Sequence, residues 1–294
     1  MDAVERLTAI RQFSKDGKRA PHKPLLILLA LGRLARTGSS ELAWSDVEFE
    51  LGALLDSYGL GKGGAGGAVN PFTYLESDGF WHLSREVPRA DLAAVRSAPI
   101  TGRLDDDLEQ ALLANPAELN RAARAIVEMQ FPDTLAAEVL EGCGLDAEEV
   151  LAAAASAQVV ALAKRRDPRW RGLILTAWDS SCAFCGFDGR LAGAPVGIEA
   201  AHVRWFNIDG PDDLDNGLAL CATHHKLFDR GVIGLADPQT VRVSSAFNAS
   251  TDAGKAVYDL HGLRLKPRPG TLLPAEPHVV WHGENVFRGE ALAG

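Results

Sequence analysis

The chain has 294 residues, of which 47% are hydrophobic and 23% are charged, and its formal net charge is −9. This length suggests two domains, and this hydrophobic content is that of an ordinary globular protein. Four cysteines are too few for a disulfide framework, and no apolar run approaches the roughly 18 to 20 residues that span a bilayer. The N-terminus lacks the apolar core of a secretion signal, so we expect a cytoplasmic protein with no membrane partner.

The acidic charge is unevenly distributed along the chain. Residues 104–150 hold twelve Asp and Glu against two Arg, a net charge of −10. The rest of the chain therefore sums to +1. The negative total does not exclude a nucleic-acid partner for either end of the chain.

Residues 1–103 are predicted to form a first domain of mixed structure. Periodic and Leu-rich apolar runs predict several helices. A Gly-rich loop at 59–67, which contains Lys62, has no periodicity and no bulky side chains. Ser-Asp-Gly at 77–79 lies between two aromatic-bearing segments and predicts a hairpin turn. We expect helices packed on a small antiparallel sheet.

Three short segments of this domain resemble a known binding domain. They are Ala20-Pro21-His22-Lys23-Pro24, Asn70-Pro71-Phe72-Thr73-Tyr74 and Asp78-Gly79-Phe80-Trp81. They look like the sulfur-binding domain of phosphorothioation-dependent restriction endonucleases. Those enzymes cut DNA in which sulfur has replaced a non-bridging oxygen of the backbone, and they carry a nuclease domain C-terminally.

The resemblance implies a set of contact residues for double-stranded, phosphorothioated DNA. The expected contacts are His22, Lys23, Lys62, Asn70, Pro71 and Tyr74. A sulfur atom is less strongly hydrated than oxygen, so a small apolar cup favours it. Pro71 and Tyr74 can form such a cup. By resemblance, His22 and Lys23 lie at its rim, where their donors meet the remaining anionic charge.

Other interpretations of the same residues stay open. Pro21 to Pro24 can be an ordinary helix entry, and the aromatic residues of 72–81 can be core. A methylated or hydroxymethylated base is the rival ligand within the class of modified DNA. Such a base usually needs an aromatic cage or a base-flipping pocket, whereas a compact cup with basic donors suits a backbone atom.

Residues 104–163 are rich in Ala, Leu and Glu and are predicted to form a helical connector. Pro116 and Pro132 divide the segment into separate helices. The C-terminal domain, residues 164–294, then begins with a helix at 170–178.

Four residues of the C-terminal domain have the spacing of a structural zinc site. Two residues separate Cys182 from Cys185, and two separate Cys221 from His224. Both pairs together supply the four ligands of a tetrahedral Zn²⁺ site. A redox function for the first pair would need a thioredoxin-like context, which is missing. Cys143 stands alone and is expected to be an inert buried thiol.

Three polar residues are interleaved with these ligands. His202 ends a short β-like run, Asn216 begins a turn before a second strand, and His225 lies in a helix. This strand–strand–helix order resembles the HNH endonuclease family in its zinc-bearing variant. The resemblance implies that both histidines face one cleft.

The chemistry of phosphodiester hydrolysis suits these residues. A neutral imidazole can accept a proton from the attacking water, and His202 is the candidate base. By resemblance, His225 binds a catalytic Mg²⁺ or Mn²⁺, and Asn216 orients the base by holding the loop or the imidazole.

One position departs from the family pattern. Many members place an acidic metal ligand immediately before the first histidine, where this chain has Ala201. Glu199 or Asp229 is a candidate replacement ligand. Glu199 has the opposite strand parity from His202, so we expect it to need a bulge or a strand end to reach the metal.

The sequence thus predicts an α+β protein: a mixed helical and small-sheet DNA-binding domain, a helical connector and a ββα-metal nuclease domain. The predicted function is a modification-dependent, type IV-like restriction endonuclease. The alternative from another class is a non-catalytic, zinc-bearing DNA-binding regulator, which the intact His202, Asn216 and His225 disfavour. Cutting both strands needs two active sites, so a homodimer or paired binding events are expected.

Overall fold

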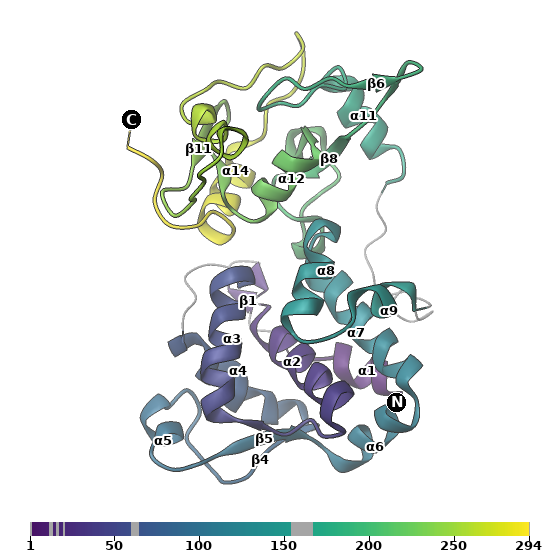
Figure 1. Cartoon of the computed structure of the whole chain (residues 1–294), viewed down its shortest axis with the longest axis vertical. Coiled ribbons are helices and arrows are strands. Elements are labelled where there is room, and N and C mark those ends of the chain that lie inside the picture. Colours follow the sequence, from purple (N-terminus) through teal and green to yellow (C-terminus); the bar gives the residue numbers. More distant parts are fainter. Residues whose placement is uncertain are drawn as a thin grey trace. The chain divides into compact units, whose positions relative to one another are not determined.

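The computed structural model describes residues 2–11, 14–15, 18–19, 21–59, 65–153 and 167–293. The chain divides into two compact units, Met1–Lys164 and Arg165–Gly294 (Figure 1). Both contain helices and small antiparallel sheets, so the predicted α+β class is confirmed. None of the helices in the described ranges combines the length and the apolar character needed to cross a membrane.

The first unit is mainly helical. Its elements are α1 (Ala3–Thr8), β1 (Ser14–Lys15), β2 (Lys18–Arg19), α2 (His22–Thr37), β3 (Leu42–Ala43), α3 (Trp44–Tyr58), α4 (Ala65–Tyr74), η1 (Leu75–Asp78), β4 (Trp81–Leu83), α5 (Leu92–Arg96), β5 (Thr101–Leu104), α6 (Asp106–Ala114), α7 (Pro116–Gln130), α8 (Asp133–Gly142) and α9 (Ala147–Ala152). One antiparallel sheet has the order β3-β5-β4. Helix α2 is buried along most of its length, which makes it the centre of this unit.

The hairpin predicted at residues 77–79 is wrong. Residues 75–78 form the 3-10 turn η1, and Gly79 ends it with a φ of 83°, a conformation that glycine adopts without strain. Strand β4 pairs with the distant strand β5, and Trp81 lies opposite Leu104. The close approach of the Trp81 ring to Gly102 leaves no room there for a Cβ atom. Tight packing across the sheet therefore outweighs the local turn preference.

The segment predicted as a connector is helical, and its helices α6 to α9 fold within the first unit. Helix α7 packs against α1 and α2 (Figure 1). Its buried residues include Leu119, Ala122, Ile126 and Val127, at the spacing of one helix face.

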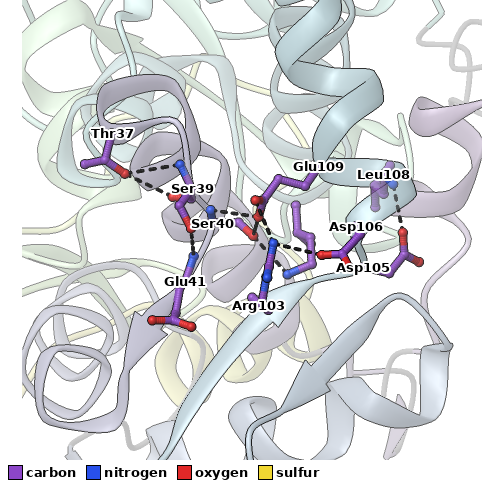
Figure 2. Close-up of polar contacts among 10 residues, drawn as sticks. Thr37, Ser39, Ser40, Glu41, Arg103, Asp105, Asp106, Leu108 and Glu109 are labelled. Atoms are coloured by element: carbon purple, nitrogen blue, oxygen red, sulfur yellow. Dashed lines mark hydrogen bonds and ion pairs between the residues drawn. The ribbon is translucent and has the colours of Figure 1, made fainter.

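A buried polar network attaches α6 to the sheet of this unit (Figure 2). The Glu109 carboxylate accepts hydrogen bonds from the Ser40 N–H at 2.9 Å and from Arg103 Nη2 at 2.8 Å. The Ser40 hydroxyl also donates to Glu109 and accepts from the Leu104 N–H at 3.0 Å. Ser40 is 0% and Glu109 is 7% exposed. Since a buried carboxylate needs such partners, the network fixes α6 in place.

The second unit contains the predicted strand–strand–helix motif. Its elements are α11 (Trp170–Ala177), β6 (Arg190–Leu191), β7 (Ala194–Pro195), β8 (Ile198–His202), η2 (Phe206–Ile208), η3 (Leu214–Asn216), β9 (Gly217–Cys221), α12 (Ala222–Asp229), β10 (Ile233–Asp237), β11 (Thr240–Val243), α13 (Asp252–Lys255), η4 (Tyr258–Leu260) and α14 (Glu276–Asn285). Strands β8 and β9 are antiparallel, and α12 packs on both. Buried apolar residues of these three elements, among them Leu218 and Phe228, form one core.

Candidate functional site

The four predicted zinc ligands form one cluster. Each offers one ligand atom, and these atoms of Cys182, Cys185, Cys221 and His224 lie within 4.8 Å of one another. The Gly186 N–H donates to the Cys182 carbonyl at 2.8 Å, which closes the first pair into a tight turn. Cys221 is the N-cap of α12, so the second pair lies on the first turn of that helix. The cluster can therefore hold a metal ion.

The cysteines of this cluster interact electrostatically. The contact with Cys221 lowers the pKa of Cys182, and the same contact raises the pKa of Cys221. The His224 ring nitrogen Nδ1 lies 3.3 Å from the Cys221 sulfur and 3.5 Å from the Cys182 sulfur. Three sulfurs and one imidazole fit the donor set and the coordination number of a structural zinc site.

The two candidate acidic ligands both contact His225. Its Nδ1 lies 2.7 Å from Glu199 Oε2, and its Nε2 lies 3.3 Å from Asp229 Oδ2. The Asp229 side chain is 2% exposed, whereas that of Glu199 is 45% exposed. Since a neutral imidazole has only one N–H, it cannot donate to both carboxylates at once. Both contacts are satisfied if each ring nitrogen carries a proton. They are also satisfied if one nitrogen donates to its carboxylate while the other nitrogen and its carboxylate bind one metal ion.

Glu199 reaches His225 from a regular part of the strand. The pairing of β8 with β9 is continuous from Ile198 opposite Cys221 to His202 opposite Gly217, so no bulge is needed. The hydrogen bond with His225 lowers the pKa of Glu199, which is therefore ionised at neutral pH. An ionised carboxylate beside an imidazole is a suitable pair of ligands for a divalent ion.

Asp212 and Trp170 both contact the His202 ring. Its Nε2 lies 2.7 Å from Asp212 Oδ1, and its ring stacks on the Trp170 ring with centroids 3.7 Å apart and an angle of 9° between the planes. The side chain of His202 is 10% exposed. The position of this imidazole is therefore closely restricted.

Asn216 binds the loop that follows His202. Its Oδ1 accepts from the Arg204 N–H at 2.8 Å, and its Nδ2 donates to the carbonyls of Arg204 and Pro211 at 3.0 and 2.9 Å. The residue is 0% exposed. These bonds are to the loop backbone, so Asn216 holds the loop that follows His202.

The contacts described for the two predicted catalytic histidines involve different residues. His202 contacts Asp212 and Trp170, whereas His225 contacts Glu199 and Asp229. Glu199 and His202 have opposite parity along β8, and His202 is its last residue. The shared cleft of both histidines stays a prediction.

His22 and Lys23 begin helix α2, and their surroundings differ. Burial lowers the pKa of His22, and its Nε2 has no hydrogen-bond partner among the described residues. Lys23 Nζ pairs with Asp78 and donates to the Arg11 carbonyl at 3.0 Å. The Lys23 and Asp78 side chains are only 13% and 3% exposed. Two of the three donors of Lys23 thus already have partners within this unit.

The other predicted contacts of this unit lie on α4. Asn70 and Tyr74 are exposed one turn apart, whereas Pro71 between them is buried. The Arg89 guanidinium lies over the Tyr74 ring, 5.7 Å from its centroid. Lys62 lies outside the described residues. The structure places an exposed aromatic beside an exposed cation, a combination suited to a charged ligand.

Sequence reasoning missed three residues with well-defined contacts in these places. Asp212 and Trp170 fix His202, and Asp78 pairs with Lys23. Spacing could not reveal these contacts, since each residue lies at least ten residues from the one that it contacts, and the motif that contains Asp78 does not specify its partner.

Comparison with known proteins identifies both units. The family model for the "ScoMcrA-like, DNA sulfur-binding domain" matches residues 1–148, and that for "HNH endonuclease" matches residues 182–236. A search of curated proteins finds no significant match.

Several solved structures are similar at low identity. The sulfur-binding domain of ScoMcrA complexed with phosphorothioated DNA is 24% identical and covers 52% of this chain and 99% of its own, with a TM-score of 0.44. The corresponding complex of SprMcrA is 26% identical, covers 50% and 93%, and has a TM-score of 0.39. The Type IV phosphorothioation-dependent restriction endonuclease ScoMcrA is 13% identical, covers 86% and 84%, and has a TM-score of 0.39. The family matches, which span half of the chain and its metal cluster, show that this protein belongs to the ScoMcrA-like DNA sulfur-binding family and joins that domain to an HNH endonuclease domain.

Proposed function

We propose that this enzyme is a modification-dependent restriction endonuclease that binds phosphorothioated double-stranded DNA and hydrolyses a phosphodiester bond nearby. One observation carries the proposal: a sulfur-binding domain and an HNH nuclease domain occur in the same chain. A nuclease domain alone has little selectivity, so the first domain decides where the second one cuts. The solved sulfur-binding domains of ScoMcrA and SprMcrA are complexes with phosphorothioated DNA, which agrees with this substrate.

Sulfur recognition is proposed for the region around His22, Pro71 and Tyr74. Burial keeps the His22 imidazole neutral at pH 7, so it offers a hydrogen bond without a fixed charge. A neutral donor beside apolar side chains favours a weakly hydrated sulfur over oxygen. Lys23 already pairs with Asp78, so other cations are proposed to contribute to DNA binding as well.

The cysteine-rich cluster is proposed to hold structural Zn²⁺. Its ligand set is complete, with no position left for a water or a substrate. Binding there joins the Cys182 turn to the start of α12, and so fixes the helix that carries His225.

The hydrolytic site is proposed to use His202 and His225 in separate roles. His202 accepts the proton of the attacking water. Glu199 and His225 hold a divalent ion of the Mg²⁺ or Mn²⁺ class, while buried Asp229 orients the His225 ring through Nε2. A divalent ion bound there supplies charge neutralisation for the leaving 3′ oxygen. Cutting both strands requires two such sites, from a homodimer or from two binding events.

Matched duplexes of one sequence, with and without a single phosphorothioate, test this function. We expect gel shifts with the sulfur duplex at lower protein concentration, and cleavage of it that depends on Mg²⁺ or Mn²⁺. His202→Ala should bind the sulfur duplex normally while cleavage falls about 10²- to 10⁴-fold, the usual contribution of a general base. His278→Ala, at another half-buried histidine of the same unit, is the matched control. Equal binding of both duplexes would exclude sulfur recognition, and normal cleavage by His202→Ala would exclude His202 as the base.

A further inference from the structure

Asp212 connects His202 to the start of the nuclease unit. One carboxylate oxygen, Oδ1, lies 2.7 Å from His202 Nε2, and the other, Oδ2, accepts from the Asp167 N–H at 2.6 Å. The Asp212 side chain is 14% exposed. Both oxygens therefore have partners in a position largely shielded from water.

This contact determines which ring nitrogen carries the proton. An ionised carboxylate only accepts hydrogen bonds, so a neutral His202 must carry its hydrogen on Nε2. Nδ1 is then the basic nitrogen of the neutral ring. A histidine whose second nitrogen is held by a carboxylate is oriented and is also a stronger base.

The ring plane is fixed as well as the tautomer. The Trp170 ring covers one face of His202, and the Trp170 indole N–H donates to the Asp213 carbonyl at 3.1 Å. The same two-residue stretch, Asp212 and Asp213, thus holds both the imidazole and the ring that stacks on it.

The backbone that carries Asp212 is itself restrained. Asn216 Nδ2 donates to the carbonyl of Pro211, the residue before Asp212, at 2.9 Å. Gly210 donates to the Trp205 carbonyl at 2.9 Å, and a Cβ there would lie 1.9 Å from the Arg204 carbonyl oxygen. The loop is closed so tightly that Asp212 has little freedom to move away.

We propose that Asp212 is a positioning residue that holds His202 as the Nε2–H tautomer and directs Nδ1 toward the attacking water. This inference rests on the proposed role of His202 as the general base. It also gives Asn216 a definite function, because the Asn216 amide holds the loop that holds Asp212.

The charged groups on the other elements packed around His202 have partners of their own, so a change at Asp212 alters only the charge that Asp212 itself contributes. From α11, Arg171 donates to the Ile198 carbonyl at 3.3 Å, at the far end of β8. From α12, His225 is bound by its own two carboxylates. Strand β9 contributes the uncharged Gly217 opposite His202, and Phe206 of η2 lies 5.5 Å from the ring.

The first test is the pH profile of cleavage by the full-length protein. Asp212→Asn keeps an oxygen acceptor but removes the negative charge beside the imidazole, and so makes the ring easier to deprotonate. Since the base must be neutral to act, we expect the acid limb of the rate profile to move to lower pH, with a reduced maximal rate. Asp213→Asn removes the same charge from the exposed neighbouring side chain and should leave the profile unchanged. An unchanged profile in Asp212→Asn, or equal shifts in both variants, would overturn the proposal.

The second test reads the tautomer without measuring activity. Two-bond ¹H–¹⁵N spectra of the histidine rings, assigned with the His202→Gln variant, should show His202 as the Nε2–H form in the unmodified protein. In Asp212→Ala the signals should move to a mixture of tautomers, and kcat should fall about 10- to 100-fold, with sulfur-duplex binding retained. An Nδ1–H tautomer in the unmodified protein would contradict the proposal. If His202→Ala cleaves normally, the base assignment fails; if only the Asp212 variants are normal, Asp212 alone is misassigned.

Discussion

The two units differ in whether their predicted functional residues contact one another. In the nuclease unit, four predicted ligands converge on one cluster, and both candidate acids contact His225. In the recognition unit, the predicted contacts have separate surroundings. Lys23 is paired with Asp78, Pro71 is buried, and Tyr74 is exposed.

The difference reflects what each site must complement. A metal ion fixes the number, type and spacing of its ligands, so the spacing of cysteines and histidines in the sequence predicts the geometry of the site. A DNA surface is complemented by side chains whose roles depend on what else they contact in the fold. A basic residue in a motif is then as readily a structural ion pair as a phosphate contact.

The largest expected effect is from removing a ligand of the cysteine cluster. Cys182→Ser should release the metal and unfold much of the second unit, since structural zinc sites contribute apparent binding free energies of about 10–16 kcal/mol. Zinc content by mass spectrometry and thermal unfolding measure this. Cys143→Ala, at a fully buried cysteine of the first unit, should keep the metal. One zinc per chain retained in Cys182→Ser would show that the two pairs do not form one site.

The next effect should fall on catalysis alone. Glu199→Gln removes a charged ligand from a half-exposed position, so we expect cleavage to fall by more than the 10- to 100-fold typical of an outer partner, with zinc content unchanged. The concentration of Mg²⁺ needed for half-maximal rate should rise.

The matched control for this variant is Glu276→Gln, an exposed glutamate of α14 in the same unit. If Glu199→Gln cleaves with the same Mg²⁺ requirement as the unmodified enzyme, the oxygen ligands lie elsewhere. The cysteine cluster would then still be assigned to folding, but Glu199 would no longer be assigned to the catalytic metal site.

The sequence predicted what depends on short spacing and missed what depends on long-range packing. Both ligand pairs and the strand–strand–helix order follow from local patterns. The contact between His202 and Asp212 spans a loop closed by Asn216, and Lys23 meets an acid 55 residues away. Nothing in the nearby sequence of either residue specifies such a partner. The turn at 77–79 fails for the same reason, because the pairing with β5 decides the path of the chain.

A smaller effect is expected from Lys23→Met in the first unit, where stability and DNA affinity can be measured separately. Lys23→Met leaves Asp78 buried without its cation, which should destabilise the first unit by about 3–5 kcal/mol in urea unfolding. DNA affinity should weaken equally for sulfur and oxygen duplexes. Arg89→Met, at an exposed cation of the same unit, should change stability little. Unchanged stability with a selective loss of the sulfur duplex would instead make Lys23 a direct contact.

The smallest expected effect concerns discrimination by Tyr74. Its ring is 42% exposed and lies beneath Arg89, so Tyr74→Ala removes apolar contact area without opening the core. If the ring forms part of the sulfur cup, its loss should weaken the sulfur duplex by about 1 kcal/mol, roughly fivefold in affinity, and leave the oxygen duplex nearly unchanged. Phe49→Ala removes a ring that is 78% exposed on α3 and should change neither affinity. Parallel weakening of both duplexes by Tyr74→Ala would mean that the ring supports general DNA binding, because an apolar cup acts only on the difference in hydration between sulfur and oxygen.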